Sequence, residues 1–84
     1  MMLDMINDLE KNIEVFNDKN KNYFAKFKRE ENGLKVKIID KRKGKVVLPK
    51  TVDFRSKSWL QDIRTIENKL KKLKSEDLNN VSKN

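Results

Sequence analysis

The sequence predicts one small α+β domain of order α-β-β-β-α, with an antiparallel three-stranded sheet and two helices on one face. Three observations predict this class: an apolar stripe with helical spacing near each end of the chain, alternating apolar and polar residues between them, and two glycine-containing turns. The length of 84 residues fits a single domain. We expect residues 1–74 to form that domain and residues 75–84 to be a flexible tail, because the tail has little apolar content.

The first expected element is a helix over residues 2–16. Its apolar residues recur at spacings of four and three, which places them on one face of a helix. Asparagine and aspartate from Asn17 onward favour an end there, because their side chains compete for backbone hydrogen bonds. The predicted stripe consists of Met2, Ile6, Leu9, Ile13 and Phe16.

Two strands are expected next, at residues 23–31 and 34–40, with Asn32-Gly33 as the turn between them. Asn-Gly is typical of a two-residue hairpin loop, because a type I′ turn needs a positive φ at both positions. Alternation of apolar and polar side chains in both segments favours strands with one buried face. A β-hairpin is therefore the predicted centre of the fold.

That turn also predicts a register for the hairpin. A loop made of Asn32 and Gly33 would place Phe27 opposite Ile38 and Lys28 opposite Lys37. Apolar side chains then share one face and lysines share the other, so turn chemistry and residue pattern agree.

A second turn is expected at residues 41–44, with Gly44 in the left-handed region of a three-residue loop. Residues 45–48 would form the third strand. Pro49 is expected to end that strand or to lie on an open edge, because proline donates no backbone hydrogen bond. Residues 50–57 are then expected to be a loop.

The second helix is expected to begin near Ser58. Ser58 and Gln61 match a capping box, in which the serine side chain and the glutamine three residues on satisfy free N–H groups. Because both helices carry five apolar positions, the sequence allows a homodimer through one amphipathic helix. The stripe of this second helix consists of Trp59, Ile63, Ile66, Leu70 and Leu73.

The composition excludes most catalytic chemistry. The chain has no cysteine and no histidine, so thiolate or imidazole metal ligands and the commonest general base are absent. The acidic pairs Glu30-Glu31 and Glu76-Asp77 are typical of solvated turns rather than of an acid–base pair. We expect no enzyme activity, no cofactor and no metal. The sequence contains no apolar run of membrane-spanning length, and a cytoplasmic location is expected.

The charge is distributed unevenly along the chain. The net charge is +8, with −4 over residues 1–18, +10 over residues 19–58 and +2 over residues 59–84. A basic segment of this kind suits a polyanionic partner. It also suits a solvated surface in a lysine-rich proteome, and the lysine bias indicates an AT-rich bacterial or phage genome. Both explanations of the basic segment stay open.

Alternation assigns the basic residues to two neighbouring surfaces. One is the sheet face turned away from the helices, and the other is the second turn, which we expect to continue that face. Phe24 lies on the same face and could stack on a base or touch a thymine methyl group. The candidate phosphate contacts are Lys26, Lys28, Lys35, Lys37, Lys41, Arg42, Lys43 and Lys45.

The order of elements resembles that of double-stranded RNA-binding domains. The segment Gly44-Lys45-Val46-Val47, followed by Arg55-Ser56-Lys57 before a helix, is similar to the third strand and helix start of that family. The resemblance implies that Arg55 and Lys57 contact phosphates. The family's proline- and histidine-containing first hairpin loop is replaced here by residues 30–33. A three-stranded sheet backed by a helix also resembles the arm-binding domains of phage integrases, which insert the sheet in the major groove.

Two functions are therefore expected. The first is a non-catalytic basic protein that binds nucleic acid, DNA in preference to RNA, through its lysine-rich sheet face and turn. The alternative is a protein-binding module, encoded by a phage or mobile element, that inhibits a host nucleic-acid-processing enzyme. The expected partner is accordingly a nucleic acid or an anion-binding protein surface, and not a membrane.

Overall fold

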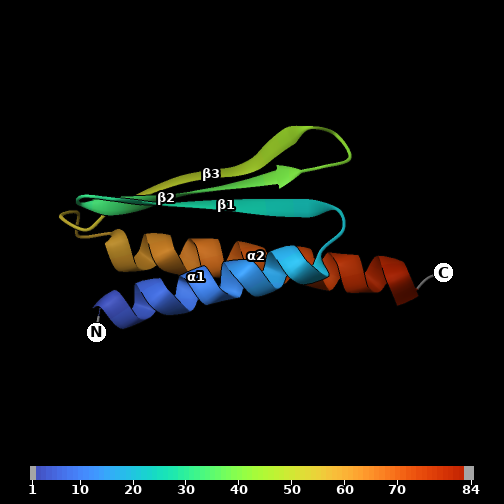
Figure 1. The fold of residues 1–84 in the computed structure, drawn as a ribbon, viewed down its shortest axis with the longest axis horizontal. Coiled ribbons are helices and arrows are strands. Elements are labelled where there is room, and N and C mark those ends of the chain that lie inside the picture. The colour runs from blue at the N-terminus through green and yellow to red at the C-terminus, as the bar shows by residue number, and fades with distance from the viewer. Residues whose placement is uncertain (1, 83–84) are drawn as a thin grey trace.

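The computed structural model describes residues 2–82, with side chains described as far as residue 75. The sheet is antiparallel with strand order β1-β2-β3, and both helices lie on one side of it (Figure 1). The predicted α+β class and element order are confirmed. The elements are α1 (Met2–Lys19), β1 (Tyr23–Glu30), β2 (Gly33–Asp40), β3 (Lys45–Asp53) and α2 (Trp59–Ser82).

The hydrophobic core fills the space between the helices and the sheet, with α1 against β1 and α2 against β3. Both predicted helical stripes lie in it, with Met2 and Trp59 half-buried at its margin. The apolar surface that suggested a homodimer is thus covered within one copy, and the dimer stays a prediction. The buried apolar residues are Ile6, Leu9, Ile13, Phe16, Tyr23, Ala25, Leu34, Val36, Ile38, Val52, Ile63, Ile66, Leu70 and Leu73.

Both helices are longer than predicted. α1 continues to Lys19, and the Asn20 N–H donates to the Phe16 carbonyl oxygen at 2.9 Å to close its last turn. α2 continues to Ser82, past the expected end at residue 74. The flexibility of residues 75–84 stays a prediction, and residues 83–84 lie outside the described residues. Within the described part of the chain, neither helix combines the length and the apolar composition that a membrane span requires.

The hairpin register differs from the predicted one by two residues. Phe27 lies opposite Val36, and Glu30 lies opposite Gly33, so the loop consists of residues 31–32. Phe27 and Ile38 are therefore not direct partners. A shift of two residues preserves which side chains share a face, because successive side chains alternate.

Gly33 is required because of its contact with a neighbouring strand and not because of the turn conformation. Gly44 is the only residue with a positive φ within the described chain, so Gly33 does not form a type I′ turn. A Cβ at Gly33 would instead overlap the carbonyl oxygen of Val52 on β3. The glycine permits the close approach of two strands, and the hairpin loop of residues 31–32 comes directly before it.

The second turn and β3 also differ from expectation. Gly44 has the predicted left-handed conformation, with φ of 64°, but Asp40 pairs with Lys45, so the loop holds four residues rather than three. A register irregularity beside Ile39 accommodates the extra residue. β3 then continues through Pro49 to Asp53, where the sequence predicted a loop.

Pro49 fits this strand because of where its nitrogen lies. It faces Lys37 on β2, and β3 is an edge strand. The backbone N–H and carbonyl of Ala25 point away from β2 and bond the Asn17 side chain. Because this direction alternates along an antiparallel ladder, the backbone N–H and carbonyl of Lys37 point toward β1 rather than toward β3. The Pro49 nitrogen therefore faces the open edge, and its missing N–H costs no ladder hydrogen bond.

Candidate nucleic-acid interface

The sheet face opposite the helices is uncovered and carries its side chains in rows across the strands. All four lysines predicted for this face lie there and are exposed. Two rows hold two lysines each, and a third row is apolar. The rows are Lys26–Lys37–Pro49, Lys28–Lys35–Thr51 and Phe24–Ile39–Val46.

Each lysine row places two like charges on adjacent strands. Such pairs have Cα atoms about 5 Å apart and destabilise the strand pair by some tenths of a kcal/mol. Lys35 is partly compensated, because its Nζ lies 3.8 Å from Glu30 Oε2. Among the described residues, Lys26, Lys28 and Lys37 have no carboxylate within ion-pair distance. The two rows therefore form a compact, poorly neutralised cationic patch, which we call the lysine patch.

An apolar row separates the lysine patch from the second turn. Phe24 is 38% exposed and Val46 is 46% exposed, with Ile39 half-buried between them. The turn lysines Lys41, Lys43 and Lys45 are exposed beyond this row. The predicted continuous basic surface is thus two basic areas with an apolar strip between them.

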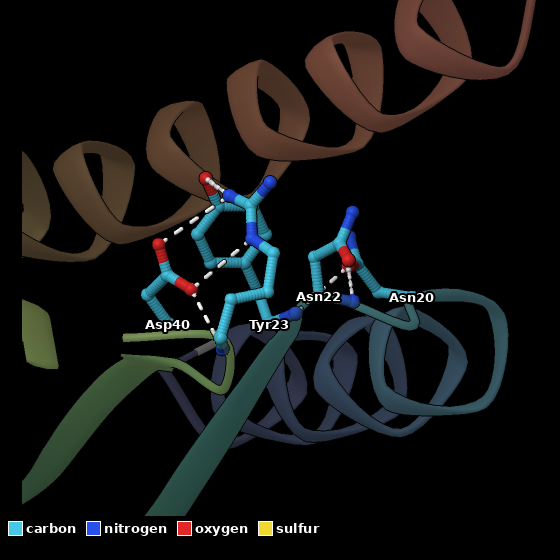
Figure 2. A network of polar contacts seen from close by, with 5 residues as sticks. Asn20, Asn22, Tyr23 and Asp40 are labelled. Carbon is cyan, nitrogen blue, oxygen red and sulfur yellow. Dashed lines mark hydrogen bonds and ion pairs between the residues drawn. The ribbon is translucent and has the colours of Figure 1, made fainter. Parts of the chain in front are cut away.

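Arg42 is held on the opposite side of the sheet from the lysine patch. Its Nε lies 3.3 Å from Asp40 Oδ1, its Nη2 donates to the Tyr23 hydroxyl at 3.2 Å, and its guanidinium stacks 5.4 Å from the Tyr23 ring centroid (Figure 2). Burial raises the pKa of Asp40, but the side-chain and backbone hydrogen bonds from Arg42 outweigh it and hold that pKa below its ordinary value. The predicted phosphate contact by Arg42 would have to compete with this ion pair.

Arg55 is paired in the same way at the other end of the sheet. Its Nε and Nη2 each lie 3.0 Å from an Asp53 carboxylate oxygen, and these hydrogen bonds lower the pKa of Asp53. Arg55 and Lys57 follow β3, whereas residues 41–44 precede it. A strand of this length separates them by about 25 Å, so the structure does not bring Arg55 and Lys57 together with the second turn.

A sequence signal could have identified both arginine pairs. Asp40 and Asp53 each end a strand, and each is followed two residues later by an arginine whose N–H donates to the Asp Oδ1 at 2.9 Å. An aspartate side chain commonly bonds the backbone two residues on. Asp-x-Arg after a strand therefore predicts a self-contained ion pair, and lysines outside such a motif remain the better candidates for binding.

The sequence did not reveal a hollow beside the outer edge of β1, with a volume of about 690 Å³. It lies between α1 and the lysine patch, so it depends on the packing of distant segments. Asn17 marks one end, where its side-chain amide donates to the Ala25 carbonyl at 2.9 Å and accepts from the Ala25 N–H at 2.8 Å. The lining residues are Glu10, Ile13, Glu14, Asn17, Phe24, Ala25, Lys26, Phe27, Lys28, Lys35 and Lys37.

No protein-family model, no curated protein and no solved structure matches this chain. Within the described residues, no group of acidic side chains is arranged to hold a metal ion. The uncovered sheet face is therefore the candidate functional site.

Proposed function

We propose that this protein is a small, non-catalytic nucleic-acid-binding protein that contacts phosphates through the lysine patch. The observation that carries the proposal is the pair of like-charged rows, Lys26–Lys37 and Lys28–Lys35, on a sheet face that no helix covers. Their mutual repulsion is relieved when a polyanion binds. Among duplexes, DNA is proposed ahead of RNA, because a sheet face cannot enter the deep, narrow major groove of A-form RNA.

The charge distribution supports this orientation. α1 carries an excess of acidic residues, and it lies on the side of the sheet away from the lysine patch. Phosphates approaching the molecule are attracted to the sheet face and repelled from α1. Binding through the sheet face is therefore the electrostatically favoured approach.

Titration of labelled DNA at two salt concentrations tests the proposal. With four phosphate contacts, the slope of log K against log salt should be about −3 to −4. Replacing Lys26 or Lys37 by alanine should weaken binding to every sequence and reduce the slope by about one. Lys72→Ala, which removes the same charge from the exposed face of α2, is the matched control and should leave the slope nearly unchanged.

Absence of DNA binding at about 50 mM salt would overturn the proposal. The apolar row favours a second candidate, a protein partner such as a nucleic-acid-processing enzyme, because Phe24 and Val46 are large exposed apolar side chains. In that case truncation of Phe24 or Val46 should dominate the loss of partner binding. The lysines should then act mainly on the association rate.

A further inference from the structure

The hollow beside β1 has two linings of opposite charge. On the sheet side it is bounded by the lysine patch and by Phe24. On the helix side it is bounded by the carboxylates of Glu10 and Glu14, and Ile13 lies between them on α1. A ligand that fits this arrangement is anionic at one end and offers hydrogen-bond donors at the other.

We infer that the hollow takes one base of single-stranded DNA while the phosphates of the same strand lie on the lysine patch. The inference rests on the proposed nucleic-acid function and adds the strandedness and the class of base. A nucleotide has the required polarity, because its phosphate is anionic and several bases carry an amino group on their edge. The volume of about 690 Å³ lies in the usual range of ligand sites.

The dimensions of the lysine patch favour a single strand. Lys26 and Lys28 are two residues apart on one strand, about 7 Å, and their partners lie on the adjacent strand about 5 Å away. The two backbones that border the major groove of B-DNA are about 12 Å apart. Four cations in so small an area contact one backbone rather than two.

The position of Phe24 favours a single strand as well. Its ring lies on the rim of the hollow and is 38% exposed. In a duplex the faces of the bases are covered by stacking, and a ring on a protein surface reaches them only after base flipping. In a single strand the faces are accessible, and stacking on an aromatic ring is worth about 1–3 kcal/mol per base.

The polar groups of the hollow select the base. Asn17 uses its amide on Ala25, and Glu10 is bound by the Arg29 guanidinium at 2.9 Å. Glu14 is exposed and has no ion-pair or hydrogen-bond partner among the described residues. A carboxylate only accepts hydrogen bonds, so it bonds the exocyclic amino group of cytosine, where thymine has a carbonyl oxygen instead. Glu14 is therefore the specificity-determining residue of the hollow.

The test measures affinities of the full chain for three probes: oligo-dC and oligo-dT of about ten nucleotides, and a mixed-sequence duplex of the same length. At neutral pH and about 50 mM salt, oligo-dC should bind about tenfold more tightly than oligo-dT. Both single strands should bind more tightly than the duplex. Phe24→Ala should weaken binding of the single strands more than binding of the duplex.

Glu14→Gln separates base recognition from simple charge. The amide both donates and accepts, so this variant should bind oligo-dC and oligo-dT within about twofold of each other. Glu31→Gln is the matched control, because it removes the same charge from the exposed hairpin loop outside the hollow, and it should keep the tenfold preference.

The outcomes distinguish this inference from the proposed function. Lysine-dependent binding that is equal for oligo-dC and oligo-dT, or stronger for the duplex, overturns the inference and leaves the proposed function standing. A preference for oligo-dC that persists in Glu14→Gln also overturns it. Absence of binding to all three probes overturns the proposed function and the inference together.

Discussion

The two faces of the sheet differ in what their side chains do, although they alternate along the same strands. On the covered face Leu34, Val36 and Ile38 are at most 1% exposed and belong to the hydrophobic core that also contains residues of both helices. On the uncovered face the same strand carries Lys35 and Lys37, and the residue opposite each of them on β1 is also a lysine. The buried apolar side chains that stabilise the fold are thus concentrated on one face, and the other face is exposed.

Neighbouring isoleucines provide the sharpest comparison of the two faces. Ile38 is fully buried and Ile39 is half-buried on the uncovered face. Ile38→Ala should lower the free energy of unfolding by about 2–5 kcal/mol, and Ile39→Ala by less than about 1.5 kcal/mol, because only the first leaves a cavity. Urea unfolding followed by circular dichroism measures both.

Ile38→Ala could unfold so small a domain, so Ile38→Val serves as the milder variant and should cost about 0.5–1.5 kcal/mol. Equal costs for alanine at Ile38 and at Ile39 would contradict the assignment of stability mainly to the covered face of the sheet.

The two glycines should respond to substitution for different reasons. Gly33→Ala places a Cβ against the Val52 carbonyl and should cost about 1–3 kcal/mol through displacement of β3. Gly44 has open space around it and a φ of 64°, so Gly44→Asn should cost less than about 1 kcal/mol, because asparagine tolerates that conformation. Thermal unfolding of both variants checks the contrast, and a larger loss for Gly44→Asn would refute it.

Asn17 should contribute more to stability than its position on α1 indicates. Asn17→Ala removes two hydrogen bonds to the Ala25 backbone and should cost about 1–2 kcal/mol. Asn12→Ala is the control, because Asn12 is exposed on the same helix, and this substitution should be nearly neutral. Denaturant midpoints compare the two variants, and similar midpoints would show that the Asn17 contacts are not stabilising.

The smallest expected effect compares two lysines in opposite surroundings. Lys37→Thr removes a like-charge contact with Lys26 and should raise stability by a few tenths of a kcal/mol while weakening DNA binding. Lys50 lies 3.2 Å from Asp62 of α2, so Lys50→Thr should lower stability by a similar amount. Melting temperatures at low salt measure both, and changes of the same sign would contradict the repulsion assigned to the lysine patch.

The faces of the strands were predictable from sequence, and the register was not. Alternation depends only on whether a residue is odd or even along the strand, so the lysine patch was assigned correctly despite a register error of two residues. The error arose because Asn32-Gly33 satisfies a local turn rule, whereas Gly33 is explained by Val52, which is distant in sequence. The requirement for glycine at this position therefore comes from a contact between segments that are distant in sequence.

The same distinction applies to the candidate site. Exposure of the lysines follows from alternation alone, and the neutralisation of Arg42 and Arg55 follows from an aspartate two residues before each. The hollow beside β1 requires the placement of α1 against the strand edge, and no local pattern specifies that placement. Glu14 consequently emerges as a candidate only from the three-dimensional arrangement.

Both edges of the sheet are poorly suited to pairing with a strand of another molecule. The outward N–H groups of Tyr23 and Ala25 on β1 bond the side chains of Asn20 and Asn17, and β3 presents Pro49, which has no N–H to offer. An incoming chain that tried to extend the sheet would find no uninterrupted ladder on either side. Self-templated growth into fibrils is thereby discouraged, and recognition is left to side chains rather than to strand addition.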